Sequence, residues 1–185
     1  MSMIRINKDL CKGCVNCIRV CPTEALRVRF GKVVLLEDRC IDCGECIIAC
    51  PEHAIEAETE EVRDMSNYRM KVALVSSVLY AQFGLDVSPY LIRSAVKEMG
   101  FDLIMDVAFG TEVSTLYLRE LVRENPEKLY ISSMCPSVVK LIQIRFPSLV
   151  ECLTPIASPE EISARYIKEK LISEGYREDE VGVFL

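Results

Sequence analysis

The sequence lacks the features that mark several common classes of protein. Its 22 basic residues are outnumbered by 28 acidic ones, the formal net charge is −6, and no basic cluster offsets it. This balance argues against a nucleic acid or an anionic membrane as partner. No apolar run approaches the about 20 residues that span a bilayer, and residues 1–10 mix charged with apolar side chains, unlike a signal peptide. We therefore expect a cytoplasmic protein without a membrane span.

Cysteine is the residue that the sequence has in excess. There are ten cysteines in 185 residues and a single histidine, His53. Without a secretion signal, so many cysteines indicate metal ligands rather than disulfides. Half of the residues are apolar, which is a globular composition, and the length suits one small domain followed by one of ordinary size.

Eight of the cysteines form an internal repeat. Each half has the spacing C-x-x-C-x-x-C-x-x-x-C followed by proline, and the cysteines are Cys11, Cys14, Cys17 and Cys21, then Cys40, Cys43, Cys46 and Cys50. Between the halves, residues 28–30 and 33–36, joined through Gly31-Lys32, predict a β-hairpin. The repeat predicts two equivalent metal sites.

The spacing suits a cubane iron–sulfur cluster. Three cysteines at two-residue intervals wrap three corners of one cube, whereas the fourth begins a helix and serves the other cube, as in two-cluster bacterial ferredoxins, which residues 1–57 resemble. We therefore predict two [4Fe–4S] clusters, with these ligands: Cys11, Cys14, Cys17 and Cys50 for one, and Cys40, Cys43, Cys46 and Cys21 for the other. The alternatives are zinc, whose cysteines usually come as separate C-x-x-C pairs, and disulfides.

Other residues of this module take supporting roles. Gly13 and Gly44 stand where the backbone has to pass close to inorganic sulfide. His53 is expected at the surface, because all eight cluster corners already have cysteine ligands. A module of this size buries little core, so we expect loss of metal to unfold it.

The rest of the chain changes pattern after a charged linker, residues 58–69. Predicted strands alternate with predicted helices, which indicates an α/β domain with a mostly parallel sheet over residues 70–185. The strands are residues 70–76, 101–107, 128–133 and 181–185, and the helices are residues 88–99, 111–124, 136–146 and 158–174. The fold class is thus an α+β ferredoxin-like module followed by an α/β domain.

Cys135 is a candidate for a third site. It follows the predicted strand 128–133 and precedes the helix that Pro136 begins, where ligands bind parallel sheets and where a helix N-terminus lowers the pKa of a thiol. A buried structural cysteine is the alternative on these grounds alone. Cys152, the tenth cysteine, is interpreted as structural.

A resemblance bears on this site. The segment 131–136 (ISSMCP), followed by Phe146-Pro147 and by Ala157-Ser158-Pro159, resembles the first active-site motif of iron-only ([FeFe]) hydrogenases: T-S-C-C-P, an aromatic residue with proline, then K-S-P. The resemblance implies that Cys135 ligates the [4Fe–4S] part of a catalytic cluster. Met134 replaces the proton-relay cysteine of the motif, and a thioether has no exchangeable proton. Whether the chain is an enzyme therefore stays open.

The same resemblance bears on the extent of the chain. A third cubane needs four ligands, and outside the repeat only Cys135 and Cys152 are available. In the family the remaining ligands come from later motifs, so we expect the chain to be part of a longer polypeptide that completes a further iron–sulfur site.

Three functions follow from these observations. The first, which we favour, is the electron-input part of a hydrogenase-like oxidoreductase, with two clusters passing electrons toward Cys135. The second is a non-catalytic redox sensor on that scaffold, and the third a ferredoxin with a domain that docks its partner. Each implies a redox protein as partner and a reducing cytoplasm, as in an anaerobe. The oligomeric state is not predicted.

Overall fold

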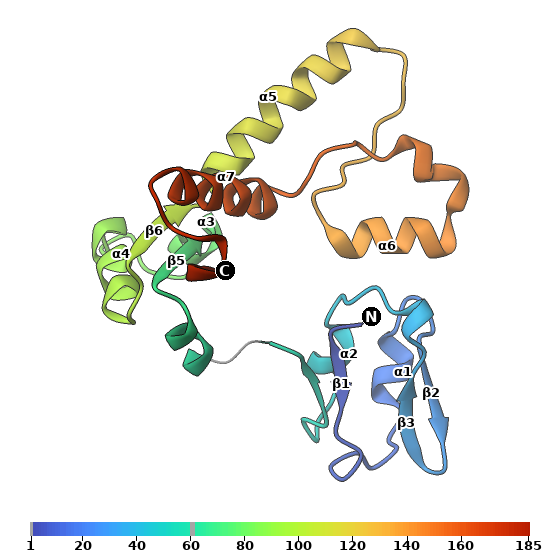
Figure 1. The fold of residues 1–185 in the computed structure, drawn as a ribbon. Coiled ribbons are helices and arrows are strands. Elements are labelled where there is room, and N and C mark those ends of the chain that lie inside the picture. The colour runs from blue at the N-terminus through green and yellow to red at the C-terminus, as the bar shows by residue number, and fades with distance from the viewer. Residues whose placement is uncertain (1, 60–61) are drawn as a thin grey trace. The chain divides into compact units, whose positions relative to one another are not determined.

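The computed structural model describes residues 2–59 and 62–185, which form two compact units. The first unit combines Met1–Glu60 with Tyr130–Leu153, and the second combines Glu61–Leu129 with Thr154–Leu185. The chain is therefore mixed α/β, and each unit is built from two separate stretches of sequence (Figure 1).

The N-terminal part of the first unit holds two small antiparallel sheets and three short helical segments. Strand β1 (Ile4–Ile6) pairs with β4 (Ile55–Ala57), and β2 (Leu26–Arg29) pairs with β3 (Lys32–Leu35). The helical segments are α1 (Asn16–Val20), the 3₁₀ turn η1 (Glu37–Arg39) and α2 (Glu45–Ile48). The first strand of the repeat thus pairs with the last.

The hairpin between the halves turns one residue earlier than the sequence predicts. Its central residues are Phe30 and Gly31, and both have positive φ, 52° and 75°. Two such residues define the turn that matches the right-handed twist of a hairpin. Gly31-Lys32 was the predicted turn, but Lys32 instead pairs with Arg29 as the first residue of β3.

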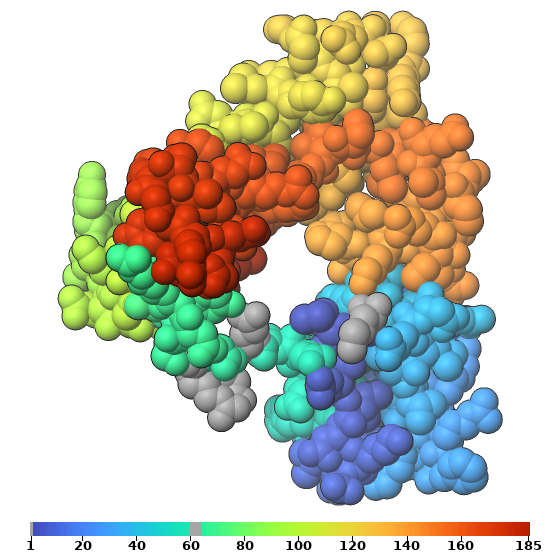
Figure 2. Space-filling view, in the orientation of Figure 1, coloured from blue at the N-terminus to red at the C-terminus, as the bar shows by residue number. Residues whose placement is uncertain are grey.

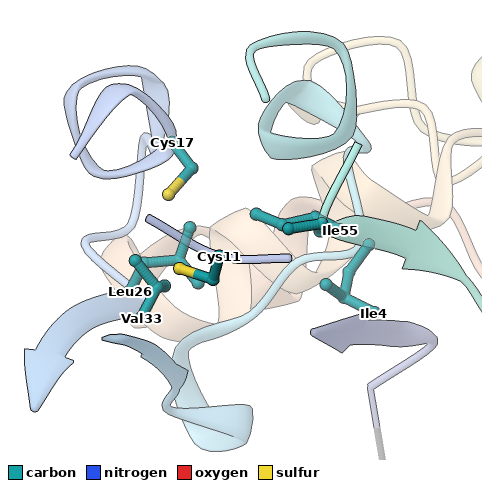
Figure 3. Close-up of a cluster of buried hydrophobic side chains, with 7 residues drawn as sticks. Ile4, Cys11, Cys17, Leu26, Val33 and Ile55 are labelled. Carbon is teal, nitrogen blue, oxygen red and sulfur yellow. The ribbon is translucent and has the colours of Figure 1, made fainter. Parts of the chain in front are cut away.

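The core of this part is small and contains sulfur. Seven buried residues form it: Ile4, Cys11, Cys17, Leu26, Val33, Ala54 and Ile55. Figure 3 shows the sulfur atoms of Cys11 and Cys17 directed toward the side chains of Leu26 and Val33. Two of the predicted iron ligands therefore belong to the core itself.

The first unit also includes a segment far along the chain, α6 (Pro136–Arg145) and the 3₁₀ segment η3 (Pro147–Cys152). The prediction of a strand at residues 128–133 is wrong. Only Ile131 pairs there, in a single parallel bridge with Leu153, and its N–H donates to the carbonyl of Cys152 at 2.7 Å. Tyr130–Leu153 forms part of the first unit, so this stretch pairs within itself instead of extending the sheet of the second unit.

The second unit is organised around a three-stranded parallel sheet in the order β6-β5-β7. The strands are β5 (Met70–Val75), β6 (Leu103–Asp106) and β7 (Val181–Phe184). The α-helices are α3 (Ser77–Tyr80), α4 (Pro89–Glu98), α5 (Ala108–Glu124) and α7 (Pro159–Ser173). Two 3₁₀ segments complete the unit, η2 (Val62–Asn67) and η4 (Glu178–Glu180). The sheet is parallel, as predicted.

Helix α7 covers one face of this sheet. Ile167 and Leu171 of α7 pack against Val72, Leu74 and Val181, and all five are buried. Ser158 caps the N-terminus of α7, since its hydroxyl accepts the N–H of Glu161 at 3.2 Å. Among the described residues, no helix combines the length and the apolar character that crossing a membrane requires.

Helix α5 packs against α7 at unusually close range. A Cβ atom added at Gly110 would lie 2.0 Å from the carbonyl oxygen of Pro159 and 2.6 Å from Oγ of Ser163. The N–H of Gly110 instead donates to that Ser163 hydroxyl at 3.1 Å. The absence of a side chain at Gly110 is what permits this contact.

We expect Gly110→Ala to destabilise the second unit by about 1–3 kcal/mol, the usual cost of overpacking a tight contact. The measurement is the urea midpoint followed by far-ultraviolet circular dichroism. Glu120→Ala, an exposed change on the same helix, is the control and should cost less than about 0.5 kcal/mol. Equal midpoints for the two variants would show that α5 and α7 do not meet at Gly110.

Candidate iron–sulfur sites

The eight repeated cysteines line two cavities in the first unit. Four of them surround about 320 Å³ of space between atoms, part of it open to solvent: Cys11, Cys14, Cys17 and Cys50. The other four surround about 330 Å³: Cys21, Cys40, Cys43 and Cys46. We call these the Cys50 cavity and the Cys21 cavity, after the cysteine that each takes from the other half of the repeat. Each predicted set of four lines one cavity, while iron ligation itself stays a prediction.

Left-handed backbone at equivalent positions shapes both ligand loops. Gly13 and Asp42 have φ of 68° and 53°, and Val15 and Gly44 have φ of 62° and 78°. A valine in this region is a real outlier, since its branched Cβ crowds the backbone. Strain of about 1–3 kcal/mol persists where the surroundings demand it. The loop conformation is thus imposed by the site rather than by residue preference.

The fourth cysteine of each half receives a backbone hydrogen bond. The N–H of Ala25 donates to Sγ of Cys21 at 3.2 Å, and the N–H of Ala54 donates to Sγ of Cys50 at 3.3 Å. These two bonds occupy the same position in the repeat. Such bonds favour the thiolate and tune an iron–sulfur cluster.

Three of the thiols, Cys17, Cys40 and Cys46, have a pKa raised above the ordinary value of a cysteine. Burial, with smaller contributions from neighbouring Cys40 and Cys43, raises the pKa of Cys46 to about 11. Burial also raises the pKa of Cys17 and of Cys40. A metal therefore has to displace protons to bind here, which is the usual coupling at cysteine sites.

The donor set of each cavity fits a [4Fe–4S] cluster. Each has four sulfur donors, a largely apolar wall and an N–H directed at a ligand sulfur. Apart from residues 1, 60 and 61, which are not described, no three histidine, cysteine or acidic side chains converge as a single-ion site. The cysteines are all free.

The two cavities open to solvent at the same ligand. Cys14 and Cys43, the second cysteine of each half, are exposed, whereas the other six are buried or half-buried. Each cluster would therefore present one corner to the surface, and these corners are equivalent in the repeat.

A charged network that the sequence did not predict adjoins the Cys21 cavity. The carboxylate of Asp42 accepts hydrogen bonds from the Ser2 hydroxyl at 2.6 Å and from the Met3 N–H at 3.0 Å, and it pairs with Lys140 of α6. Burial alone would raise the pKa of Asp42, but these hydrogen bonds outweigh it and lower the pKa to about 2. One signal was available: Asp42 stands where Gly13 stands in the first half.

The remaining predicted residues, Cys135, Cys152 and His53, do not line either cavity. Cys135 is exposed and precedes Pro136 at the start of α6, where its carbonyl accepts the N–H groups of Val138 and Val139. Cys152 is half-buried in η3. His53 is exposed, as expected, but sits in left-handed backbone with φ of 49° rather than on a helical turn.

Taken together, the two sulfur-lined cavities define an iron–sulfur protein. Comparison with known families agrees and goes further. The chain belongs to the family described as iron only hydrogenase large subunit, C-terminal domain, whose model matches residues 69–185. A second model, a 4Fe-4S dicluster domain, matches residues 3–51. The resemblance inferred from the motifs of both parts is thereby confirmed.

Two curated relatives match shorter stretches. Iron hydrogenase 1 of Clostridium pasteurianum is 28% identical over 94 residues, which cover 49% of this chain and 16% of that protein. The cytosolic Fe-S cluster assembly factor NAR1 of Yarrowia lipolytica is 24% identical over 71 residues, 38% of this chain and 14% of that protein. The chain thus spans a small part of either relative.

The repeat offers a matched pair of glycine variants. A Cβ at Gly13 would lie 2.3 Å from the carbonyl oxygen of Gly31, whereas a Cβ at Gly44 meets nothing within 4 Å. Both residues have positive φ, so alanine costs about 1–2 kcal/mol at either position from the backbone alone. We expect Gly44→Ala to cost that amount and Gly13→Ala to cost about 1–3 kcal/mol more.

The measurement is the urea midpoint of the iron-loaded chain, followed by loss of the visible absorbance of the clusters. Gly44→Ala serves as the control for backbone strain. If Gly13→Ala were no worse than Gly44→Ala, the first ligand loop would not pack against the hairpin turn.

Proposed function

We propose that the chain is an electron-transfer protein that carries two [4Fe–4S] clusters, one in the Cys50 cavity and one in the Cys21 cavity. The observation that carries the proposal is that each cavity is lined by four cysteines. When bound, each cluster supplies a one-electron redox centre; the protein holds it, shields it and adjusts its potential.

The proposed electron path rests on which ligand cysteines are exposed and on the place of the Cys135 segment in the same unit. A redox protein partner meets the surface at an exposed ligand corner, Cys14 or Cys43. The electron then passes between the clusters toward the segment of α6 that carries Cys135, as in the electron-input part of a hydrogenase-like oxidoreductase. In support, that segment belongs to the same compact unit as both cavities. A reducing compartment such as the cytoplasm suits the ten free cysteines.

A second role, a non-catalytic one, is favoured by Met134. The thioether cannot relay a proton, and one of the relatives is named as a cluster assembly factor rather than as a hydrogenase. Both roles share the two-cluster module. They differ in what the segment around Cys135 does with the electron.

The proposal predicts the metal content. After anaerobic reconstitution, we expect about eight irons and about eight sulfides per chain, with the EPR spectrum of two interacting cubanes after reduction. Cys135→Ser is the control and should leave this content unchanged. About twelve irons in the wild-type chain, or zinc with little iron, would contradict two-cluster binding.

The crossed ligand sets predict a distinct pattern in double variants. Cys21→Ser with Cys43→Ser removes two ligands from one cavity, so one cubane signal should survive intact. Cys21→Ser with Cys14→Ser removes one ligand from each cavity, so neither cubane should survive intact. Iron content and EPR of the reduced proteins distinguish the two. One intact cubane in the second double variant would assign Cys21 to the same cluster as Cys14.

A further inference from the structure

Among the positions at which the two halves of the repeat differ in charge, one lies beside a ligand sulfur. In the first half Gly13 follows Lys12 and precedes Cys14; in the second half Asp42 occupies that place. Both residues adopt left-handed backbone, so the loops keep one shape. The carboxylate of Asp42 lies 3.4 Å from Sγ of Cys40. The Cys21 cavity therefore has a negative group against a ligand sulfur, and the loop of the Cys50 cavity has glycine there.

The carboxylate is enclosed and held in place. The Asp42 side chain is 17% exposed, and the Ser2 hydroxyl lies between it and Cys40, 2.6 Å from Oδ1 and 3.2 Å from Sγ. That hydroxyl also accepts the N–H of Ile4 at 3.2 Å. Charges that are partly buried are weakly screened, so the field of Asp42 reaches the Cys21 cavity from just behind Cys40, whose sulfur its carboxylate approaches to 3.4 Å.

The positive partner of Asp42 comes from the segment that carries Cys135. Lys140 lies one helical turn and a residue beyond Cys135 on α6 and pairs with Asp42. Figure 2 shows the orange atoms of this part of the chain against the blue atoms of the N-terminal loops of the same unit. The ion pair joins residues 98 positions apart in the sequence.

A second contact of α6 reaches the same cavity. Arg145 donates to the carbonyl of Pro22 at 3.4 Å and lies 3.8 Å from the carboxylate of Glu24. Pro22 directly follows Cys21, which lines the Cys21 cavity. The two charged side chains of α6, Lys140 and Arg145, thus both contact loops beside the Cys21 cavity.

We propose that Lys140 sets the reduction potential of the cluster in the Cys21 cavity by compensating the charge of Asp42. An added electron makes a cluster more negative, so an uncompensated carboxylate beside a ligand sulfur opposes reduction and a nearby ammonium group favours it. The inference rests on the proposed two-cluster function. Lys140 is a positioning and tuning residue: it touches Asp42 and acts on the cluster through it.

The test is a redox titration of the reconstituted full chain followed by EPR. Lys140→Gln should make one cluster about tenfold harder to reduce, a downward shift of about 59 mV for one electron, and leave the other unchanged. Lys140→Arg should retain the wild-type potential. Lys168→Gln removes a lysine of similar exposure, 38% against 41%, from the second unit and should shift neither potential.

A double variant separates charge compensation from other effects. Asp42→Asn keeps a residue that tolerates left-handed backbone and should raise the potential of the same cluster. Asp42→Asn with Lys140→Gln should return it to near the wild-type value. An unchanged potential in Lys140→Gln, or a shift that Asp42→Asn fails to reverse, would overturn the proposal. If the Lys140→Gln variant does not retain its clusters, the Asp42→Asn variant alone still tests the proposal. An unchanged reduction potential in Asp42→Asn would overturn the proposal.

Failure of the inference differs from failure of the proposed function. Wild-type protein without two cubane signals would refute the two-cluster function itself. Two cubanes whose potentials ignore both Asp42 and Lys140 would refute only the tuning role.

Discussion

The N-terminal part of the protein depends on sulfur to complete its core. Seven buried residues form that core, two of them are cysteines, and two sulfur-lined cavities adjoin it. A hydrophobic core of this size is too small to offset the conformational entropy that about sixty residues lose on folding. If clusters bind as proposed, their binding and the folding of this part form one equilibrium, because a site that exists only in the folded chain adds its binding free energy to folding. The strained φ of Val15 is tolerable on the same account.

The dependence on the cysteine sites explains why the two ligand loops share a backbone conformation although several of their residues differ. Glycine and aspartate share one left-handed position, and valine and glycine share another. What the repeat preserves is backbone shape around each cavity, together with the N–H bond to the fourth cysteine. Side chains at those positions are free to differ as long as they tolerate the conformation, and the charge at such a position can therefore differ between the two cavities.

Sequence reasoning succeeded where the signal was local and failed where it was distant. The cysteine spacing predicted the two sets that line the cavities, and the alternation of predicted strands and helices included β5, β6, β7 and α7. The strand predicted at residues 128–133 did not form, because Tyr130–Leu153 joins the first unit and pairs within itself. Asp42 was missed because its meaning depends on Lys140, a partner that no periodicity in either segment indicates.

The placement of Tyr130–Leu153 gives the asymmetry of the repeat a physical role. Two clusters with identical ligands and similar loops would have similar potentials, and an electron would have little preference between them. Both cavities have an ion pair nearby, Lys12 with Glu52 at the Cys50 cavity and Lys140 with Asp42 at the Cys21 cavity, but the pairs stand at different positions, and the carboxylate of Asp42 lies 3.4 Å from Sγ of Cys40. The compensating ammonium belongs to the helix that begins beside Cys135. On the proposed function, the charge balance of a cluster in the Cys21 cavity would be tied to the position of α6, and the segment expected to receive the electron would also contribute to how readily its donor cluster accepts one.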